Sequence, residues 1–126
     1  MKRIFPTVFL AFVISGSAMA DYSLYSEQFS ACMDKSEGVT FAMVDCINEE
    51  LAIQDARLNS AYKKLGAKLT PERKIQLRDV QRIWIRYRDA NCAFHADPEG
   101  GSLARIAGNH CFLQETTLRA QELEQL

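Results

Sequence analysis

The stretch TFAMVDCINEELAIQDARLNSAYKKLGAKLTPERKIQLRDVQRIWIRYRDANC, which covers residues 40–92, decides the fold. Its first half carries large residues mostly three or four positions apart, as on one face of a helix: Ile47, Leu51, Leu58, Tyr62, Leu65 and Leu69. Thr70 and Pro71 then indicate a new helix start, because Thr caps helices well and Pro fits their first turn. The second half places on one face Leu77, Val80, Trp84, Tyr87 and Asn91. We therefore predict two long helices that fold back as an antiparallel hairpin.

Charged residues on the inner faces of this hairpin are predicted to be structural. Counting from a turn at residues 69–70 places Glu50 at the level of Arg88 and Asp55 at the level of Trp84. A buried carboxylate that faces an arginine is more often a structural ion pair than a catalytic group. Glu50, Asp55 and Arg88 are therefore expected to form a structural polar group.

Shorter helices are expected before and after the hairpin. One should cover residues 21–35 and the other about residues 111–126, where apolar residues recur at helical spacing. Trp84 and Tyr87 are expected to lie in the core that these helices complete. The predicted fold class is all-α, a small disulfide-stapled helical domain built on a long antiparallel hairpin, with short first and last helices.

The beginning of the chain has the three parts of a secretory signal peptide. Basic residues follow Met1 directly, residues 4–14 are mainly apolar, and the small residues Ala18 and Ala20 form a cleavage site. The apolar run is shorter than the roughly 20 residues that span a bilayer. We therefore predict a signal peptide over residues 1–20, cleaved after Ala20.

The remaining residues, 21–126, are predicted to form a single domain in the bacterial periplasm or outside the cell. No cysteine follows the cleavage site directly and no later segment is long and apolar, so neither a lipid anchor nor a membrane span is expected. Without Lys2 and Arg3, 13 basic residues face 16 acidic ones, a net charge of −3. This charge and the lack of a basic, aromatic-rich patch argue against nucleic acid as a partner.

Four cysteines in a short exported chain predict two disulfides. Pairing Cys32 with Cys46 and Cys92 with Cys111 is favoured, because packed helices lie about 8–10 Å apart, wider than a disulfide spans. Pairing Cys46 with Cys92 and Cys32 with Cys111 is the alternative, since Cys46 and Cys92 should share one level of the hairpin. Zinc is not favoured, because no two cysteines have the close spacing of structural zinc sites. No metal and no cofactor are expected.

The irregular stretch over residues 93–110 is the predicted partner-binding loop. A Cys92–Cys111 disulfide would fix both of its ends and lower the entropy cost of binding. The residues proposed for partner contact are His95, Asp97 and Glu99. A solvated connector without a binding role is the alternative interpretation.

Catalytic motifs are not found in the sequence. There is no Gly-x-Ser-x-Gly, and the Gly-Gly-Ser at residues 100–102 follows no strand and lacks the lysine of a phosphate-binding loop. Disulfide-bonded cysteines cannot supply a thiolate nucleophile. We therefore expect no catalytic residues and a protein that is not an enzyme.

One group of residues resembles the LprI-type lysozyme inhibitor family, formerly a domain of unknown function numbered 1311. The resemblance covers nearly all of residues 21–126 and rests on Asp55, Leu58, Asn59, Tyr62, Leu77, Gln81, Arg82, Trp84, Ile85, Tyr87, Arg88, Asp89, Cys92, Gly100, Gly101, Ser102, Cys111, Thr117 and Arg119.

This resemblance implies a small helical, disulfide-containing domain of the bacterial envelope. Lysozyme inhibition is ascribed to the founding mycobacterial lipoprotein, whose lipidation cysteine this sequence lacks. The function expected is that of a periplasmic or secreted protein that binds lysozyme and blocks its cleft. The alternative is an envelope interaction or stress-related module with another partner.

Overall fold

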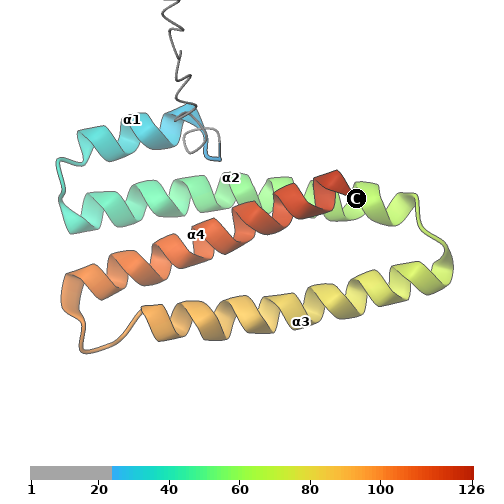
Figure 1. Cartoon of the computed structure of the whole chain (residues 1–126). Coiled ribbons are helices and arrows are strands. Elements are labelled where there is room, and N and C mark those ends of the chain that lie inside the picture. Colours follow the sequence, from blue (N-terminus) through green and yellow to red (C-terminus); the bar gives the residue numbers. More distant parts are fainter. Residues whose placement is uncertain (1–23) are drawn as a thin grey trace, which may run out of the picture.

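The computed structural model describes residues 24–126, which form four helices (Figure 1). These are α1 (Glu27–Lys35), α2 (Thr40–Ala67), α3 (Pro71–His95) and α4 (Gly101–Gln125). The all-α fold class is confirmed. None of these helices is long and apolar enough to cross a membrane. The predicted signal peptide lies outside the described residues.

The turn between α2 and α3 forms where the sequence predicts it. Thr70 has an extended backbone, and its hydroxyl accepts a hydrogen bond from the Arg73 N–H at 3.4 Å. Pro71 occupies the first turn of α3, where its missing N–H costs no helical hydrogen bond. The two long helices consequently run antiparallel, as a helical hairpin does (Figure 1).

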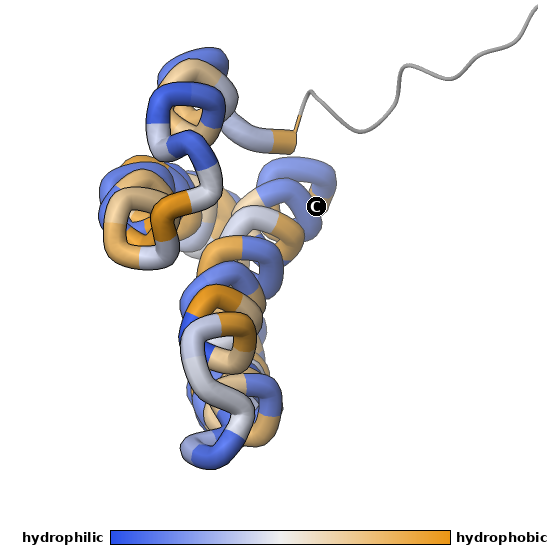
Figure 2. Tube along the Cα trace, turned by 90° about the vertical axis from the view of Figure 1, so that its left-hand side faces the viewer, coloured by the Kyte–Doolittle hydropathy of each residue, from blue (hydrophilic) through white to orange (hydrophobic). Residues whose placement is uncertain are grey.

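The last helix is longer than predicted, and this changes how the hairpin packs. α4 begins at Gly101 rather than near Cys111, and it lies between α2 and α3 (Figure 1). The main helix contacts join α2 to α4, α4 to α3 and α1 to α2, and α1 lies on the far side of α2 (Figures 1 and 2). Because α4 contacts helices on both sides, its buried residues are not confined to one narrow stripe.

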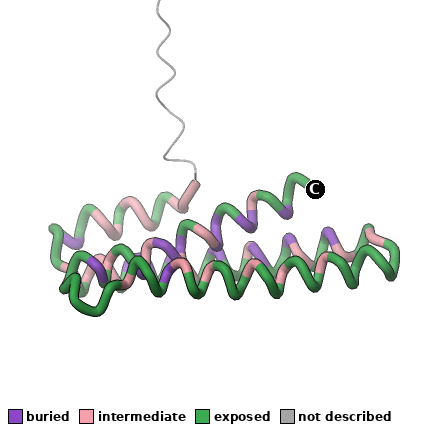
Figure 3. The backbone as a smooth tube through the Cα atoms, turned by 60° about the horizontal axis from the view of Figure 1, so that its bottom comes forward, coloured by how far each residue is buried: buried purple, intermediate pink, exposed green. Residues whose placement is uncertain are grey.

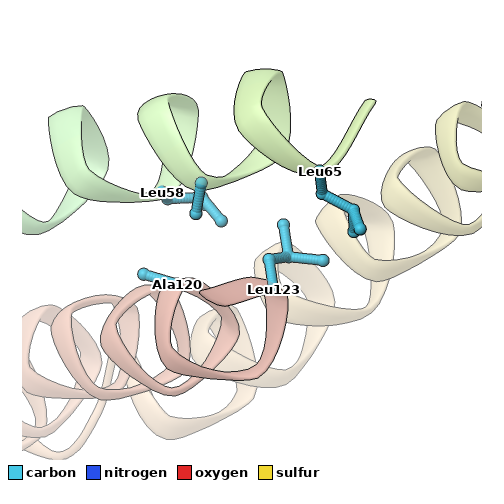
Figure 4. Close-up of a cluster of buried hydrophobic side chains, with 5 residues drawn as sticks. Leu58, Leu65, Ala120 and Leu123 are labelled. Atoms are coloured by element: carbon cyan, nitrogen blue, oxygen red, sulfur yellow. The ribbon is translucent and has the colours of Figure 1, made fainter. Parts of the chain in front are cut away.

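One cluster of the core lies where α2 meets α4, close to the turn between α2 and α3 (Figure 4). Its buried members are Leu58, Ala61, Leu65, Ala120 and Leu123. The side chains of Leu77 and Trp84 pack against this cluster from α3. Removing such side chains from water is the main favourable term in folding, about 25 cal/mol per Å² of apolar area.

α3 buries a narrower face than the sequence suggests. Leu77 and Trp84 are partly buried as predicted, but Val80 and Tyr87 are 51% and 56% exposed. The expected core position of Tyr87 is therefore wrong. The cause is that α3 packs mainly against α4 alone, so that Cys92 is the only fully buried residue of this helix. Figure 3 shows the described backbone coloured by burial, with α3 mostly exposed or intermediate.

Glu50 is buried, as expected, but its hydrogen-bond partners differ from the predicted one. Its side chain is 2% exposed and accepts hydrogen bonds from the Ser26 N–H at 2.9 Å, from the Ser26 hydroxyl and from Gln54 Nε2 at 2.8 Å. The predicted ion pair with Arg88 is wrong, because α4 separates α2 from α3. Glu50 instead attaches the start of α1 to α2.

An ion pair attaches the end of α4 to α2. Arg57 donates from Nε and Nη2 to the Glu124 carboxylate at 2.8 and 2.6 Å. These hydrogen bonds lower the pKa of the Glu124 carboxyl and raise the pKa of Arg57. Both side chains are about one third exposed or more, so the pair contributes only a fraction of 1 kcal/mol.

Replacing Glu124 with Gln should therefore lower the free energy of unfolding by about 0.5 kcal/mol at neutral pH. Since the pKa of Glu124 is lower in the folded chain, its contribution is present at neutral pH and is lost as the pH falls through the acid range. Urea unfolding at neutral and acid pH tests this, with the exposed Glu49→Gln as control. A difference between wild type and Glu124→Gln that grows on acidification would contradict it.

Candidate functional site: the turn between α3 and α4

The predicted partner-binding loop is a short, ordered turn. The long loop expected over residues 93–110 is wrong, since helix covers all of that range except residues 96–100. Within the turn, the Glu99 N–H donates to the Asp97 carboxylate at 2.9 Å and the Gly100 N–H donates to the Asp97 carbonyl at 3.0 Å. Asp97 thus organises the turn through both its side chain and its backbone.

Two features hold this turn against the helices. Cys92 and Cys111 form a disulfide with a Cα–Cα distance of 5.4 Å, and Cys32 pairs with Cys46, which is the pairing that the sequence favours. A Cβ added at Gly108 would lie 2.5 Å from the Ala96 Cβ, so a side chain there would separate α4 from the turn. The turn is therefore fixed by a covalent bond and by close packing.

Large apolar side chains flank the turn and point into solvent. Phe94 is 81% exposed and Leu103 is 78% exposed. His95, Asp97 and Glu99, the three residues proposed for partner contact, are also exposed. We name as the turn surface Phe94, His95, Asp97, Pro98, Glu99 and Leu103. A shallow hollow lined by Phe94, His95 and Pro98 lies within it.

The sequence did not identify Phe94 and Leu103 as members of this surface. Phe94 lies two residues after a buried cysteine, and Leu103 lies in a segment that was not expected to be helical. Folded proteins expose many apolar residues and bury many others. The sequence alone therefore does not show that Phe94 and Leu103 are exposed. The cysteines on either side were the signal that pointed to this region.

A second cluster contains many residues on which the family resemblance rests. The Trp84 ring lies near two guanidinium groups, with Arg88 Cζ at 5.0 Å and Arg119 Cζ at 5.9 Å from its centroid. Arg119 is 7% exposed, and its Nε donates to Gln81 Oε1 at 3.0 Å. Arg88 Nη1 donates to Thr116 Oγ1 at 3.3 Å. This cluster joins α3 to α4 and is structural.

Asp55 and Arg88 lie at the same hollow of the surface, but they do not form the predicted structural polar group with Glu50. Both line a shallow hollow that also contains Phe112, whose ring lies 5.4 Å from Arg88 Cζ. Arg88 forms its ion pair with Asp89 at 2.9 Å, and Asp55 accepts a hydrogen bond from Asn59 at 3.3 Å. Asp55 is exposed, and Glu50 is bound elsewhere, so the three residues do not meet as one group.

Among residues 24–126, no group of three or more His, Cys, Asp or Glu side chains is placed to hold a metal ion. The features that the turn surface offers are apolar contact, carboxylates and an imidazole on a rigid support. These suit the binding of another protein.

These features define a small, disulfide-bonded helical domain that works outside the cytoplasm. A family model described as lysozyme inhibitor LprI matches residues 32–123, and the chain belongs to this family. A similar protein is an uncharacterised protein of Rhizobium meliloti (strain 1021), 27% identical over 95 residues, which covers 64% of this chain and 68% of that protein. No solved structure matches the chain.

Proposed function

We propose that the protein is exported by a cleavable signal peptide over residues 1–20 and inhibits lysozyme by placing the turn surface in its cleft. The observation that carries the proposal is the position of exposed Phe94 and Leu103 beside a turn that the Cys92–Cys111 disulfide holds. Membership of the LprI family supports lysozyme as the partner.

The turn surface has the composition of an inhibitory contact. Phe94 supplies a large apolar anchor, and side chains of this kind dominate binding energies when they fill a pocket. Asp97 and Glu99 complement a basic enzyme, and this complementarity increases the rate of association more than the affinity. His95 offers a ring N–H that can donate to one of the carboxyl groups on which glycoside hydrolysis depends.

Rigidity makes this surface suitable for a cleft. A turn that is ordered before binding loses little conformational entropy in the complex. Here the hydrogen bonds of Asp97 and the disulfide fix the backbone on both sides of residues 96–100. A flexible loop over residues 93–110 would bind more weakly, because more residues would have to become ordered in the complex.

Hydrolysis of peptidoglycan by lysozyme in the presence of residues 21–126 tests the proposed function. The expected result is inhibition that saturates near one inhibitor per enzyme for at least one type of lysozyme. If a large molar excess inhibits none of several lysozyme types, the protein has another partner. Capture of a stoichiometric envelope protein would then support the alternative function as an interaction module.

Neutralising the acidic residues of the turn should weaken inhibition. The double variant Asp97→Asn/Glu99→Gln keeps side-chain size, and Asn can still accept the Glu99 N–H bond. We expect the inhibition constant to rise about tenfold and to depend less on salt. The control Asp45→Asn/Glu49→Gln makes the same charge change at exposed positions of α2. Equal inhibition by both double variants would exclude the turn as the contact.

A further inference from the structure

α3 carries a second apolar stripe that no other described helix covers. We name as the outer stripe Val80, Ile83, Tyr87 and Ala90, which end one helical turn before Phe94 of the turn surface. All four are exposed, with Val80, Ile83 and Tyr87 at 51%, 58% and 56%. The stripe is distinct from the inner face of α3, where Leu77 and Trp84 pack on the core.

The spacing of the outer stripe is that of a helix–helix seam. Its members follow one another at alternating intervals of three and four residues, the pattern by which helices pair along a coiled-coil interface. From Val80 to Ala90 the stripe extends over about 15 Å at 1.5 Å per residue. A narrow seam of this kind fits one apolar helix face.

The charged residues beside the outer stripe indicate which helix packs against it. Asp79 and Arg86 each precede a seam residue, Val80 or Tyr87, so both lie on the same flank. In an antiparallel pair of α3 helices with a two-fold axis between residues 82 and 83, Asp79 of one copy faces Arg86 of the other. The symmetry forms this opposite-charge contact twice.

The apolar positions match in the same register. With the axis between residues 82 and 83, Ile83 of one copy lies beside Ile83 of the other, and Val80 of one copy lies between the levels of Ile83 and Tyr87 of the other. A parallel pair would instead place Asp79 and Arg86 against the positions of Trp84 and Asn91, which lie toward α4 and carry no charge. The antiparallel register is thus the one that satisfies both the seam and its charges.

We infer that the protein forms a two-fold symmetric dimer through the outer stripes of two antiparallel α3 helices. A contact of this type uses the same patch on both copies and closes on itself. In the single chain, Asp79 forms an exposed ion pair with the neighbouring Arg78 at 2.9 Å. Replacing this pair by a contact with Arg86 of the second copy costs little free energy, because exposed ion pairs are weak. The seam buries less than the roughly 800 Å² per partner of a standard interface, so the dissociation constant is micromolar or weaker.

Sedimentation velocity of residues 21–126 over about a hundredfold range of concentration tests this dimer. A concentration-dependent shift from monomer to dimer is expected. Ile83→Glu should remove it, whereas Ile53→Glu, at a 43% exposed position of α2, should not. A monomer at all concentrations, or a dimer that Ile83→Glu leaves intact, overturns the inference. Flotation of the monomer with anionic lipid vesicles would identify a membrane as the occupant instead.

Charge exchange tests the register. Arg86→Asp and Asp79→Arg should each weaken dimerisation about fivefold or more, because like charges then face each other twice. The double variant carries both changes and should recover the wild-type dimer. Failure of the double variant to recover excludes the antiparallel register. Far-UV circular dichroism shows whether each variant is folded, and these exposed positions leave the core unchanged.

Discussion

Replacing Cys92 and Cys111 together with alanine is expected to lower the free energy of unfolding by about 3 kcal/mol. The two cysteines are 19 residues apart, and a closed loop of this length restricts the unfolded chain by about that amount. Inhibition of lysozyme should weaken about tenfold as well, because the turn surface would have to be ordered on binding. Urea unfolding and inhibition assays measure the two effects.

The other disulfide provides a matched control. Cys32 and Cys46 are 14 residues apart, so Cys32→Ala/Cys46→Ala should lower the free energy of unfolding by a similar amount, about 3 kcal/mol. This bond joins α1 to α2, away from the turn surface, and its loss should leave inhibition by the folded protein unchanged. Equal loss of inhibition in both double variants would mean that the Cys92–Cys111 bond has no special role in binding.

Replacing Ser26 with alanine is expected to lower the free energy of unfolding by about 2 kcal/mol. The Ser26 hydroxyl donates to the buried Glu50 carboxylate and also accepts the Phe29 N–H at 3.2 Å as the cap of α1. Its removal leaves a buried charge with fewer donors and a helix end without its cap.

Ser30→Ala in the same helix is the control for this substitution, since Ser30 neither caps α1 nor contacts Glu50. Urea unfolding should show a near-neutral effect for Ser30→Ala. Hydrogen exchange should show faster opening of α1 in Ser26→Ala. If the two substitutions lower stability equally, Ser26 does not anchor α1 through Glu50.

Local rules were sufficient for the turn between the long helices. A Thr-Pro pair after a helical pattern indicates the start of a new helix. In the structure Thr70 caps α3 and Pro71 lies in its first turn. The favoured disulfide pairing is confirmed, but the distance argument behind it is not, because both bonds join neighbouring helices, α1 to α2 and α3 to α4, with Cα–Cα distances of 5.7 and 5.4 Å. The alternative pairing of Cys46 with Cys92 fails because α4 lies between α2 and α3 and supplies Cys111 to Cys92.

The extent of α4 could not be predicted by the same rules. Gly100, Gly101 and Gly108 all favour interruption of a helix in sequence. In the structure Gly100 and Gly101 lie where α4 begins, Gly101 with a φ of +65°, whereas Gly108 is helical because it packs against Ala96. A glycine selected for close approach has the same sequence signal as one that ends a helix.

The inner face of α3 was misassigned for a related reason. In α3, one face at helical spacing includes Val80 and Tyr87, and a neighbouring face includes Gln81 and Arg88. Because Val80 and Tyr87 are apolar, the sequence pattern assigned their face to the core, which is wrong. The buried face instead includes Gln81 and Arg88, which bind Arg119 and Thr116 and lie beside the Trp84 ring. Long polar side chains pack through their stems, which a binary pattern does not register.

The candidate site was predicted in part. His95, Asp97 and Glu99 lie where the cysteine spacing pointed, at an exposed connection between helices. The length of that connection and the apolar anchors beside it depend on the start of α4 and on exposure, which only the three-dimensional structure provides.

Isothermal titration of residues 21–126 into a c-type lysozyme tests the central claim most directly. We expect saturable binding near one to one, about tenfold weaker for Asp97→Asn/Glu99→Gln and unchanged for Asp45→Asn/Glu49→Gln. Absence of saturable binding to lysozymes of several types, with the folded wild-type protein at high concentration, would contradict it.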